Sequence, residues 1–390
     1  MSCRTVVIAS LAGEVVLKSP RTRPRFERRL LQNVAEALER NGISCDKVRI
    51  KAARLEVECC STEEECKRVV AVLRRVFGLH AVAVACALSY SSLEDLVDQA
   101  ASIAVEWVRG KKFAVRARRS GVEPFTSLDV AKALGSALLG SSAGVDLENP
   151  DVEVYVEVRG STAYVFREWI PAAGGLPIGV EGRALALFSG GLDSPVAAWM
   201  ASKRGLEVHL LHFVLGSHLS LRDALRVARR LAREWLYGYE PILYAVDFIP
   251  VARLITALVP GPIRQLVLRL AMYDAASALA ERLGFDALVT GESLGQVSSQ
   301  TLLNLASLTL AHGCRTLILR PLIGMDKEEI VALSRRIGLY EISSQTKEYC
   351  QIVQGPAATR SKPEQLAKEY EKVSSLVSEA ISTYMEIPLA

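Results

Sequence analysis

The residues with the clearest chemical meaning form the segment Phe188-Ser189-Gly190-Gly191-Leu192-Asp193-Ser194-Pro195. Two adjacent glycines let backbone N–H groups approach phosphate oxygens closely, and a helix start adds the positive end of its dipole. The apolar run 184–188 precedes the loop, and Pro195 suits the first turn of a following helix. The alternative is a glycine-rich helix start without a ligand. A complete motif between a strand and a helix favours a loop that binds pyrophosphate.

The loop lacks the lysine of a Walker A motif, which normally reaches the β- and γ-phosphates of a nucleotide. Its pattern instead resembles the PP-loop (N-type ATP pyrophosphatase) superfamily. This resemblance implies that ATP is cleaved between its α- and β-phosphates and that AMP passes to a carbonyl oxygen. It also implies that Asp193 is essential and that the phosphates are held by Ser189, Gly190, Gly191 and Ser194.

Two further polar clusters follow expected strands. Residues 290–302 follow one strand, and ligands of open α/β sheets bind at the carboxyl ends of strands. In residues 320–330, Asp326 is suited to cap a helix. Lys327 beside it either stays a surface amine or reaches the pyrophosphate and stabilises the charge that builds on it.

The second half of the chain must position these groups. Strands are expected at residues 184–188, 207–214, 242–246, 287–290 and 316–319. Helices are expected between them, for example at residues 195–203, 221–235, 263–283 and 327–337. The alternation predicts a doubly wound α/β domain with a mostly parallel sheet over residues 183–390.

The first half predicts two smaller α/β units. Residues 1–90 show the order β-α-β-β-α-β of a ferredoxin-like domain, with a capping box formed by Thr62 and Glu65. Residues 91–170 show helices at 92–109 and 127–139, a strand at 112–118 and a hairpin of strands 152–158 and 162–167. The segment 171–182 is rich in glycine and proline, which predicts a linker.

Composition narrows the classes of protein further. The chain has 390 residues, half of them hydrophobic, and its apolar runs are strand-sized, far below the roughly 18 residues of a membrane span. No secretion signal precedes the first strand, so we expect a cytoplasmic protein without membrane association. None of the eight cysteines is spaced C-x-x-C, so no metal site is expected. Most of them are expected to be small buried hydrophobic residues.

Basic residues gather in two segments of the first half, although the net charge is only +4. Residues 18–29 hold six basic residues and one acid, and residues 109–119 hold six basic residues and no acid. Such segments can neutralise several phosphates of a nucleic acid, but each one alone is more typical of a solvated face. The residues assigned to RNA contact are Lys18, Arg21, Arg25, Lys111, Lys112, Arg116, Arg118 and Arg119.

Taken together, these segments resemble the tRNA 4-thiouridine synthetase family (tRNA sulfurtransferases) in the order ferredoxin-like, THUMP, PP-loop. The resemblance covers essentially the whole chain. It is carried by Leu17-Lys18-Ser19 with Arg21, Arg25 and Phe26, by residues 113–119 with Pro124-Phe125, by residues 174–179, by the three motifs above and by Glu348-Tyr349-Cys350.

This resemblance implies that ATP, with Mg²⁺, adenylates O4 of the uridine at position 8 of tRNA, and that sulfur then replaces this oxygen. It implies nucleotide contacts from Leu187, Phe188, His212, Phe213, Arg269, Gly291 and Gln300, with Lys327 facing the pyrophosphate. His212 considered alone is more typical of a structural residue. Family members are homodimers, so a homodimer is also expected.

Cys350 is implied to receive or resolve the transferred sulfur, a task that suits a thiolate. Longer family members carry the persulfide in a C-terminal rhodanese domain. This chain ends at Ala390 after an expected helical tail, so we expect a short form. The donor stays open between a persulfide protein and sulfide, and Cys314 is either a partner of Cys350 or a buried structural residue. A role in thiamine synthesis is weakly supported, because it rests on the rhodanese domain.

Two other functions compete with this interpretation. An ammonia-using ligase of the same fold would need a glutaminase and has no reason to carry RNA-type modules. A non-catalytic tRNA-binding protein would not need Asp193 or Lys327. Exchange of pyrophosphate into ATP that depends on tRNA separates the three functions.

Overall fold

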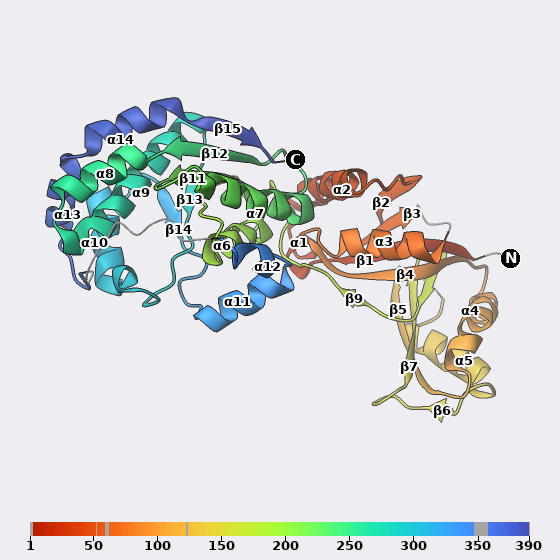
Figure 1. Cartoon of the computed structure of the whole chain (residues 1–390). Coiled ribbons are helices and arrows are strands. Elements are labelled where there is room, and N and C mark those ends of the chain that lie inside the picture. Colours follow the sequence, from red (N-terminus) through yellow and green to blue (C-terminus); the bar gives the residue numbers. More distant parts are fainter. Residues whose placement is uncertain (1–2, 52, 59–61, 122–123, 347–357, 390) are drawn as a thin grey trace. The chain divides into compact units, whose positions relative to one another are not determined.

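The computed structural model describes residues 3–51, 53–58, 62–121, 124–346 and 358–389. The chain folds as two compact units, Met1–Leu176 and Pro177–Ala390, each built on its own sheet (Figure 1). Among the described residues, no helix combines the length and the apolar character that a membrane crossing requires.

The first unit begins with the expected ferredoxin-like order, with one short helix added. Its elements are β1 (Arg4–Leu11), α1 (Gly13–Val16), α2 (Arg23–Arg40), β2 (Lys47–Lys51), β3 (Arg54–Glu58), α3 (Glu63–Leu73) and β4 (Leu79–Ser89). The predicted capping box is present, since Thr62 Oγ1 accepts from the Glu65 N–H and the Glu65 carboxylate accepts from the Thr62 N–H.

The unit continues with α4 (Leu93–Val108), β5 (Lys112–Ser120), α5 (Ser127–Leu139), β6 (Gly144–Val145), β7 (Val152–Arg159), β8 (Thr162–Phe166) and β9 (Ile170–Pro171). In the described chain, all the strands of this unit join one nine-stranded sheet, in the order β2-β3-β1-β4-β8-β7-β5-β6 with β9 beside β4. Strands β4 and β8 pair from Cys86↔Val165 to Ser89↔Thr162. The two expected N-terminal units therefore share one sheet.

The second unit alternates strands and helices as predicted. Its elements are β10 (Arg183–Leu187), α6 (Asp193–Lys203), β11 (Glu207–Val214), α7 (Leu219–Trp235), β12 (Ile242–Asp247), α8 (Ile249–Leu258), α9 (Arg264–Leu283), β13 (Ala287–Val289), α10 (Leu302–His312), β14 (Leu317–Leu319), α11 (Lys327–Arg336), α12 (Tyr340–Ser343), α13 (Pro363–Glu371), α14 (Ser374–Ala380) and β15 (Met385–Pro388). Strands β14-β13-β10-β11-β12 are parallel neighbours, which confirms the predicted doubly wound sheet.

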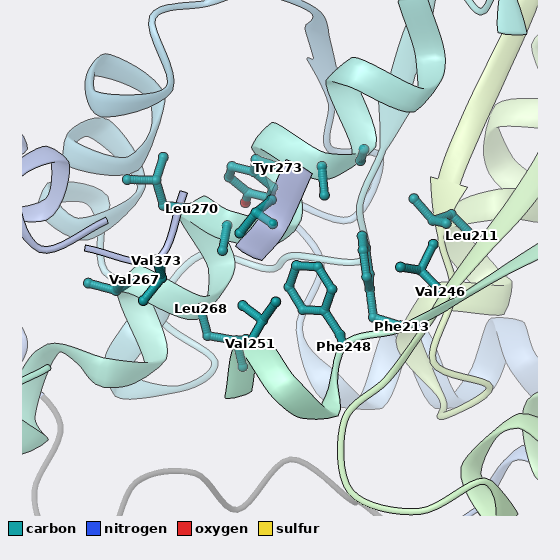
Figure 2. Packing of buried hydrophobic residues seen from close by; sticks show 14 of the residues in the cluster. Leu211, Phe213, Val246, Phe248, Val251, Val267, Leu268, Leu270, Tyr273 and Val373 are labelled. Carbon is teal, nitrogen blue, oxygen red and sulfur yellow. The ribbon is translucent and has the colours of Figure 1, made fainter. Parts of the chain in front are cut away.

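Helices cover both faces of this sheet (Figure 1). One layer contains α6, α7, α11 and α12, and the other contains α8, α9, α10, α13 and α14. Helix α9 is apolar on most of its circumference because it packs between the sheet and its neighbouring helices. Figure 2 shows this core, where Phe213 and Phe248 meet with ring centroids 4.6 Å apart.

The end of the chain differs from the expected helical tail. After α13 and α14, β15 pairs antiparallel with β12 and forms an edge of the sheet, with Leu243 opposite Ile387. Its four residues, Met-Glu-Ile-Pro, are mostly exposed and end in Pro388, so the sequence carries no clear strand signal here. The proline is tolerated because β15 is an edge strand.

The cysteines only partly follow the expectation that they are buried. Cys66 is buried, and Cys3 and Cys86 form a disulfide with a Cα–Cα distance of 5.6 Å. Cys314 is exposed, which corrects its interpretation as a buried structural residue. It directly follows Gly313, the left-handed end of α10, and its own φ is 52°, so the chain turns outward at this point.

Candidate active site

The glycine-rich loop connects β10 to α6 as predicted. Ser194 Oγ accepts a hydrogen bond from the Ser189 N–H at 3.0 Å, and Ser189 Oγ accepts one from the Gly191 N–H at 3.3 Å. The two serines therefore fold the loop back onto the start of α6. The backbone N–H groups at this helix start favour an anion such as phosphate.

Two glycines are required by close packing. Gly190 has φ of +81°, and a Cβ there would lie 2.8 Å from Ala224 Cα of α7. A Cβ on Gly291, just after β13, would lie 3.0 Å from the Asp193 carbonyl carbon and from the Ser194 nitrogen. Any side chain at either position would displace the loop, since real contacts of Cβ are rarely so short.

Asp193 connects the loop with two distant segments. Lys327 Nζ, at the start of α11, donates to Asp193 Oδ1 at 2.8 Å, and Gln296 Nε2 donates to Asp193 Oδ2 at 3.0 Å. Helix α11 begins at the predicted cap, where Asp326 and Glu329 form a capping box. The cap fixes the first turn of α11 and with it the place of Lys327.

His212 joins strand β11 to the loop. Its Nδ1 donates to the Phe188 carbonyl at 2.9 Å, so its Nε2 accepts from Ser220 Oγ at 3.1 Å. Burial lowers the pKa of His212, and the bond to the Phe188 carbonyl only partly opposes this effect. The imidazole is therefore neutral and holds the end of β10 beside the start of α7.

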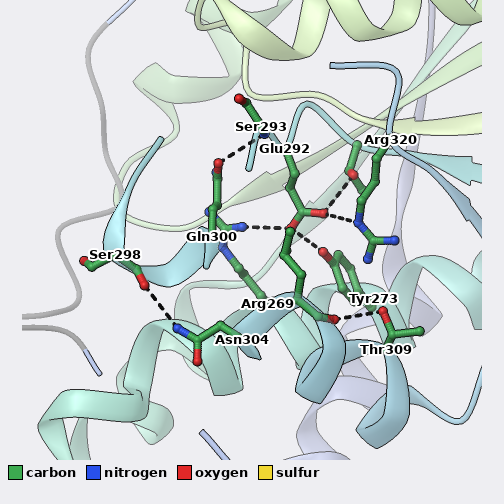
Figure 3. A network of polar contacts seen from close by, with 11 residues as sticks. Arg269, Tyr273, Glu292, Ser293, Ser298, Gln300, Asn304, Thr309 and Arg320 are labelled. Atoms are coloured by element: carbon green, nitrogen blue, oxygen red, sulfur yellow. Dashed lines mark hydrogen bonds and ion pairs between the residues drawn. The ribbon is translucent and has the colours of Figure 1, made fainter. Parts of the chain in front are cut away.

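Glu292 is the centre of a buried polar network (Figure 3). Its carboxylate accepts hydrogen bonds from Arg269 Nη1 at 2.8 Å, from Arg320 Nε at 2.8 Å, from Thr290 Oγ1 at 3.0 Å and from the hydroxyl of Tyr273. Burial alone would raise the pKa of Glu292, but the two guanidinium groups outweigh it and lower the pKa. Glu292 is thus charged at neutral pH.

These groups surround one cavity of about 510 Å³. Its wall contains all the predicted nucleotide-binding residues except Gly190. It also contains Asp193 and Lys327, two of the three residues predicted to be catalytic. Together, these wall residues are Leu187, Phe188, Ser189, Gly191, Asp193, Ser194, His212, Phe213, Arg269, Gly291, Gln300 and Lys327. Gly190 instead packs against α7. The third predicted catalytic residue, Cys350, lies outside the described residues.

The cavity also contains residues that the sequence did not indicate. Glu292, Gln296 and Tyr273 line it, and so do three hydroxyl residues at and after the end of α12, which are Ser343, Ser344 and Thr346. Glu292 and Gln296 stand inside the polar segment 290–302, so their position after a strand was a usable signal. No sequence motif marks Tyr273 or the three hydroxyl residues, so their place in the cavity could not be predicted.

Asp193 and Glu292 are the carboxylates in this wall, and no cluster of three or more metal-ligating side chains occurs among the described residues. Both oxygens of Asp193 accept hydrogen bonds, and Glu292 is bonded to two arginines. This arrangement fits a Mg²⁺ ion that arrives on nucleotide phosphates, because such an ion typically takes only one or two carboxylates from the protein.

The predicted RNA-contacting residues lie in the first unit. Lys111, Lys112, Arg118 and Arg119 of the β5 region and Arg21 and Arg25 of the α2 region are exposed. Arg116 is half-buried, because its Nε donates to Glu153 at 2.7 Å and its Nη2 to the Leu147 carbonyl at 2.9 Å. Lys18 is half-buried too, with its Nζ 4.6 Å from the centre of the Phe26 ring.

Fold and loop together define an ATP-binding PP-loop protein that carries a ferredoxin-like and a THUMP module. Family comparison agrees in each part of the chain. Residues 8–83 match the ThiI ferredoxin-like domain, residues 90–168 the THUMP domain, and residues 179–375 the family described as Thiamine biosynthesis protein (ThiI).

Curated relatives cover nearly the whole chain. A tRNA sulfurtransferase of Desulfurococcus amylolyticus is 47% identical over 94% of this chain and 75% of its own length. A probable tRNA sulfurtransferase of Aeropyrum pernix is 46% identical over 93% of this chain and 91% of its own. The chain therefore belongs to the ThiI family of tRNA sulfurtransferases.

A solved structure shows the same architecture. A 4-thiouridine synthetase in complex with RNA and bound ATP superimposes with a TM-score of 0.82 over 99% of this chain and 100% of that one, at 28% identity. PH1313 from Pyrococcus horikoshii superimposes with a TM-score of 0.62 over 86% of this chain and 99% of that one, at 26% identity.

Proposed function

We propose that this protein is an ATP-dependent tRNA sulfurtransferase that converts the uridine at position 8 of tRNA into 4-thiouridine. The observation that carries the proposal is the single cavity that joins the Ser-Gly-Gly-x-Asp-Ser loop, Lys327 and the predicted adenosine wall. The names of the family relatives and the solved complex with RNA and ATP support it.

The first step is adenylation of the base. O4 of the uridine attacks the α-phosphorus as the N3 proton of the base is released to solvent. A bond forms between O4 and the α-phosphorus, and the bond from that phosphorus to the bridging oxygen breaks. Pyrophosphate leaves with the bridging oxygen. The loop N–H groups and Lys327 are suited to hold this anion, because they offer donors and positive charge where negative charge builds up. His212 and Phe188 hold the wall on the adenosine side.

Asp193 orients Lys327 in this step. Its carboxylate holds the ammonium at 2.8 Å, which places one cation at the mouth of the loop before the nucleotide arrives. Preorganised charge of this kind stabilises a transition state without further reorganisation. Mg²⁺ bound with ATP would offset phosphate charge, with Asp193 as the carboxylate available to it.

The second step replaces oxygen by sulfur. A sulfur nucleophile attacks C4 of the base, and the bond from C4 to oxygen breaks with AMP as the leaving group. Cys350 is proposed to handle the sulfur, because the family resemblance assigns it this task. The sulfur donor is proposed to be sulfide or a persulfide protein. Sulfide gives 4-thiouridine directly when AMP leaves. With a persulfide, the outer sulfur attacks C4, and a thiol, for which Cys350 is proposed, then attacks the donor's sulfur in the base–S–S–donor link, so that 4-thiouridine leaves and a disulfide forms between Cys350 and the donor.

The first unit is proposed to bind tRNA. Its support is the exposed basic residues Lys111, Lys112, Arg118 and Arg119 around β5, together with Arg21 and Arg25 near α2. Contacts of such residues with phosphates position an RNA by backbone and shape more than by base sequence. A tRNA substrate also favours the cytoplasmic location expected from the sequence.

The test is incubation of the protein with unmodified tRNA, ATP, Mg²⁺ and sulfide, followed by nucleoside analysis. Formation of 4-thiouridine by the wild type is expected, and its absence with every donor contradicts the proposal. Cys350→Ser is assayed with sulfide as the donor. Full activity of this variant would show that Cys350 acts in sulfur delivery and not in adenylation. Pyrophosphate exchange that does not require tRNA would favour an amidating ligase. The proposed homodimer is tested by light scattering.

A further inference from the structure

Glu292 occupies an unusual place beside the cavity. It follows Gly291, whose backbone packs against Asp193 and Ser194 of the loop, and its side chain is only 7% exposed. Its partners come from different elements, with Arg269 and Tyr273 on α9 and Arg320 directly after β14. One carboxylate therefore connects two segments to the strand end beside the loop (Figure 3).

The two arginines use different carboxylate oxygens. Arg269 donates to Oε1 and Arg320 to Oε2, so the carboxylate lies between two guanidinium groups and the network carries a net charge of +1. Arg269 lines the cavity together with Glu292, whereas Arg320 does not. Arg320 therefore supports Glu292 from outside the cavity wall, and Arg269 presents positive charge to the cavity.

The network keeps its protonation state around neutral pH. The two guanidinium groups hold the pKa of Glu292 below its ordinary value despite burial. Burial and the adjacent Glu292 raise the pKa of Tyr273, so its hydroxyl remains a donor. A bond to one guanidinium nitrogen leaves the other donors of Arg269 for a ligand, since arginine has five N–H groups in a rigid fork.

We propose that Glu292 is a positioning residue that holds Arg269 against the cavity so that its guanidinium stabilises the phosphate of ATP at which adenylation occurs. This inference rests on the proposed function. The family resemblance implies only that Arg269 contacts the nucleotide. The inference adds that Glu292, a buried acid on another segment, orients the Arg269 guanidinium for this contact. The alternative is that the ion pair only stabilises the fold. In that case, a variant that keeps the net charge of the network at +1 should retain the wild-type kcat.

The test compares Glu292→Gln, Arg320→Gln and the double variant Glu292→Gln/Arg320→Gln with wild type. Glu292→Gln leaves two largely buried guanidinium groups without a counter-charge and is expected to be destabilised. The double variant restores the net charge of +1, because one acid and one base are lost together. It is therefore expected to unfold at nearly the wild-type temperature while Arg269 still lacks its carboxylate.

The readouts are kcat and KM for ATP in tRNA-dependent pyrophosphate exchange, with the unfolding temperature measured in parallel. If Glu292 positions Arg269, the double variant loses at least about tenfold in kcat, because a misplaced donor no longer meets the developing charge. Arg320→Gln keeps Glu292 and loses less. A double variant with wild-type kcat and KM overturns the inference.

Tyr273→Phe and Thr290→Val provide a second route if the double variant does not fold. Each removes one donor to Glu292 without changing charge, and an expected loss of about threefold in kcat corresponds to one ordinary hydrogen bond. Unchanged kcat in both variants overturns the inference. A wild type that makes no 4-thiouridine refutes the proposed function instead, so the two failures are distinguishable.

Discussion

The two units each bury an acid between two arginines, but in different surroundings. In the first unit, Arg54 Nε and Nη2 donate to the two oxygens of Glu157 at 2.7 and 2.8 Å, and Arg159 Nη2 lies 3.3 Å away. In the second unit, Arg269 and Arg320 flank Glu292 at 2.8 Å each. Glu157 lies on a sheet face, whereas Glu292 lines the cavity.

The comparison shows that the same local chemistry serves different ends. The bond from Arg54 to Glu157 joins β3 to β7, strands that are not neighbours in the sheet, so it links distant parts of the first unit. The bonds of Glu292 fix a cation beside a cavity. Buried charge alone therefore does not identify a functional site. The position of the charged group relative to a cavity distinguishes a functional role from a structural one.

The largest expected effect concerns the second unit, where function depends on the cavity. Asp193→Asn keeps the shape of the side chain but removes the charge that holds Lys327, so pyrophosphate exchange should fall by about 10³-fold. The rate of pyrophosphate exchange at saturating ATP and tRNA measures this loss. Asp286→Asn is the matched control, because Asp286 precedes β13 at the opposite end of the strand and accepts from the Arg183 N–H. Equal rates for Asp193→Asn and wild type would contradict the proposed site.

In the first unit, the expected effect is on stability. Glu157→Gln leaves Arg54 and Arg159 without their counter-charge, which should lower the free energy of unfolding by about 3 kcal/mol. Urea denaturation measures this loss. At saturating tRNA, kcat should stay at the wild-type value. A loss of kcat by a folded Glu157→Gln protein would remove the distinction between the two buried acids.

A pH-dependent effect should come from His209 in the second unit. Burial and the adjacent Arg183 lower the pKa of this imidazole to about 4, while in the unfolded chain it is near its ordinary value of 6.5. Below pH 6.5 the unfolded state binds a proton that the folded state does not, so stability falls as pH decreases towards 4. The loss at pH 5 is about 2 kcal/mol. Urea denaturation from pH 7 to 5 should show a flatter profile for His209→Asn, and identical profiles would exclude this source.

The smallest expected effect is at the surface of the first unit. Arg118→Ala should weaken tRNA binding about fivefold and reduce the salt slope by roughly one, as for the loss of one phosphate contact. Arg116→Ala should weaken it less, since Glu153 already binds that guanidinium. Filter binding at two salt concentrations measures both variants. A larger effect for Arg116 would reverse their assigned roles.

Local patterns predicted much of the fold. The bounds of β11 and α5 agree with the expected ranges, because β11 is a short apolar run and α5 has apolar residues at helical spacing. Pairings over long sequence distances were not predictable from pattern. The joining of β4 to β8 depends on which edge of each module is free, and β15 has only four residues, most of them exposed.

The site was predicted where a motif or the family resemblance marked it. The loop and Lys327 were identified, but their direct ion pair spans 134 positions of sequence and has no local signal. Glu292 was visible only as one polar residue in a cluster, since its importance comes from three elements that meet in space. The exposure of Cys314 follows from a positive φ after Gly313 that sequence pattern does not indicate.

The pairing of β4 with β8 has a consequence for how the first unit unfolds. Hydrogen bonds between Cys86 and Ser89 on one strand and Thr162 and Val165 on the other make the ferredoxin-like and THUMP modules a single cooperative body. They should melt together in one calorimetric transition. The basic segments of both modules, which are proposed to contact tRNA, are then held at a constant spacing within the first unit.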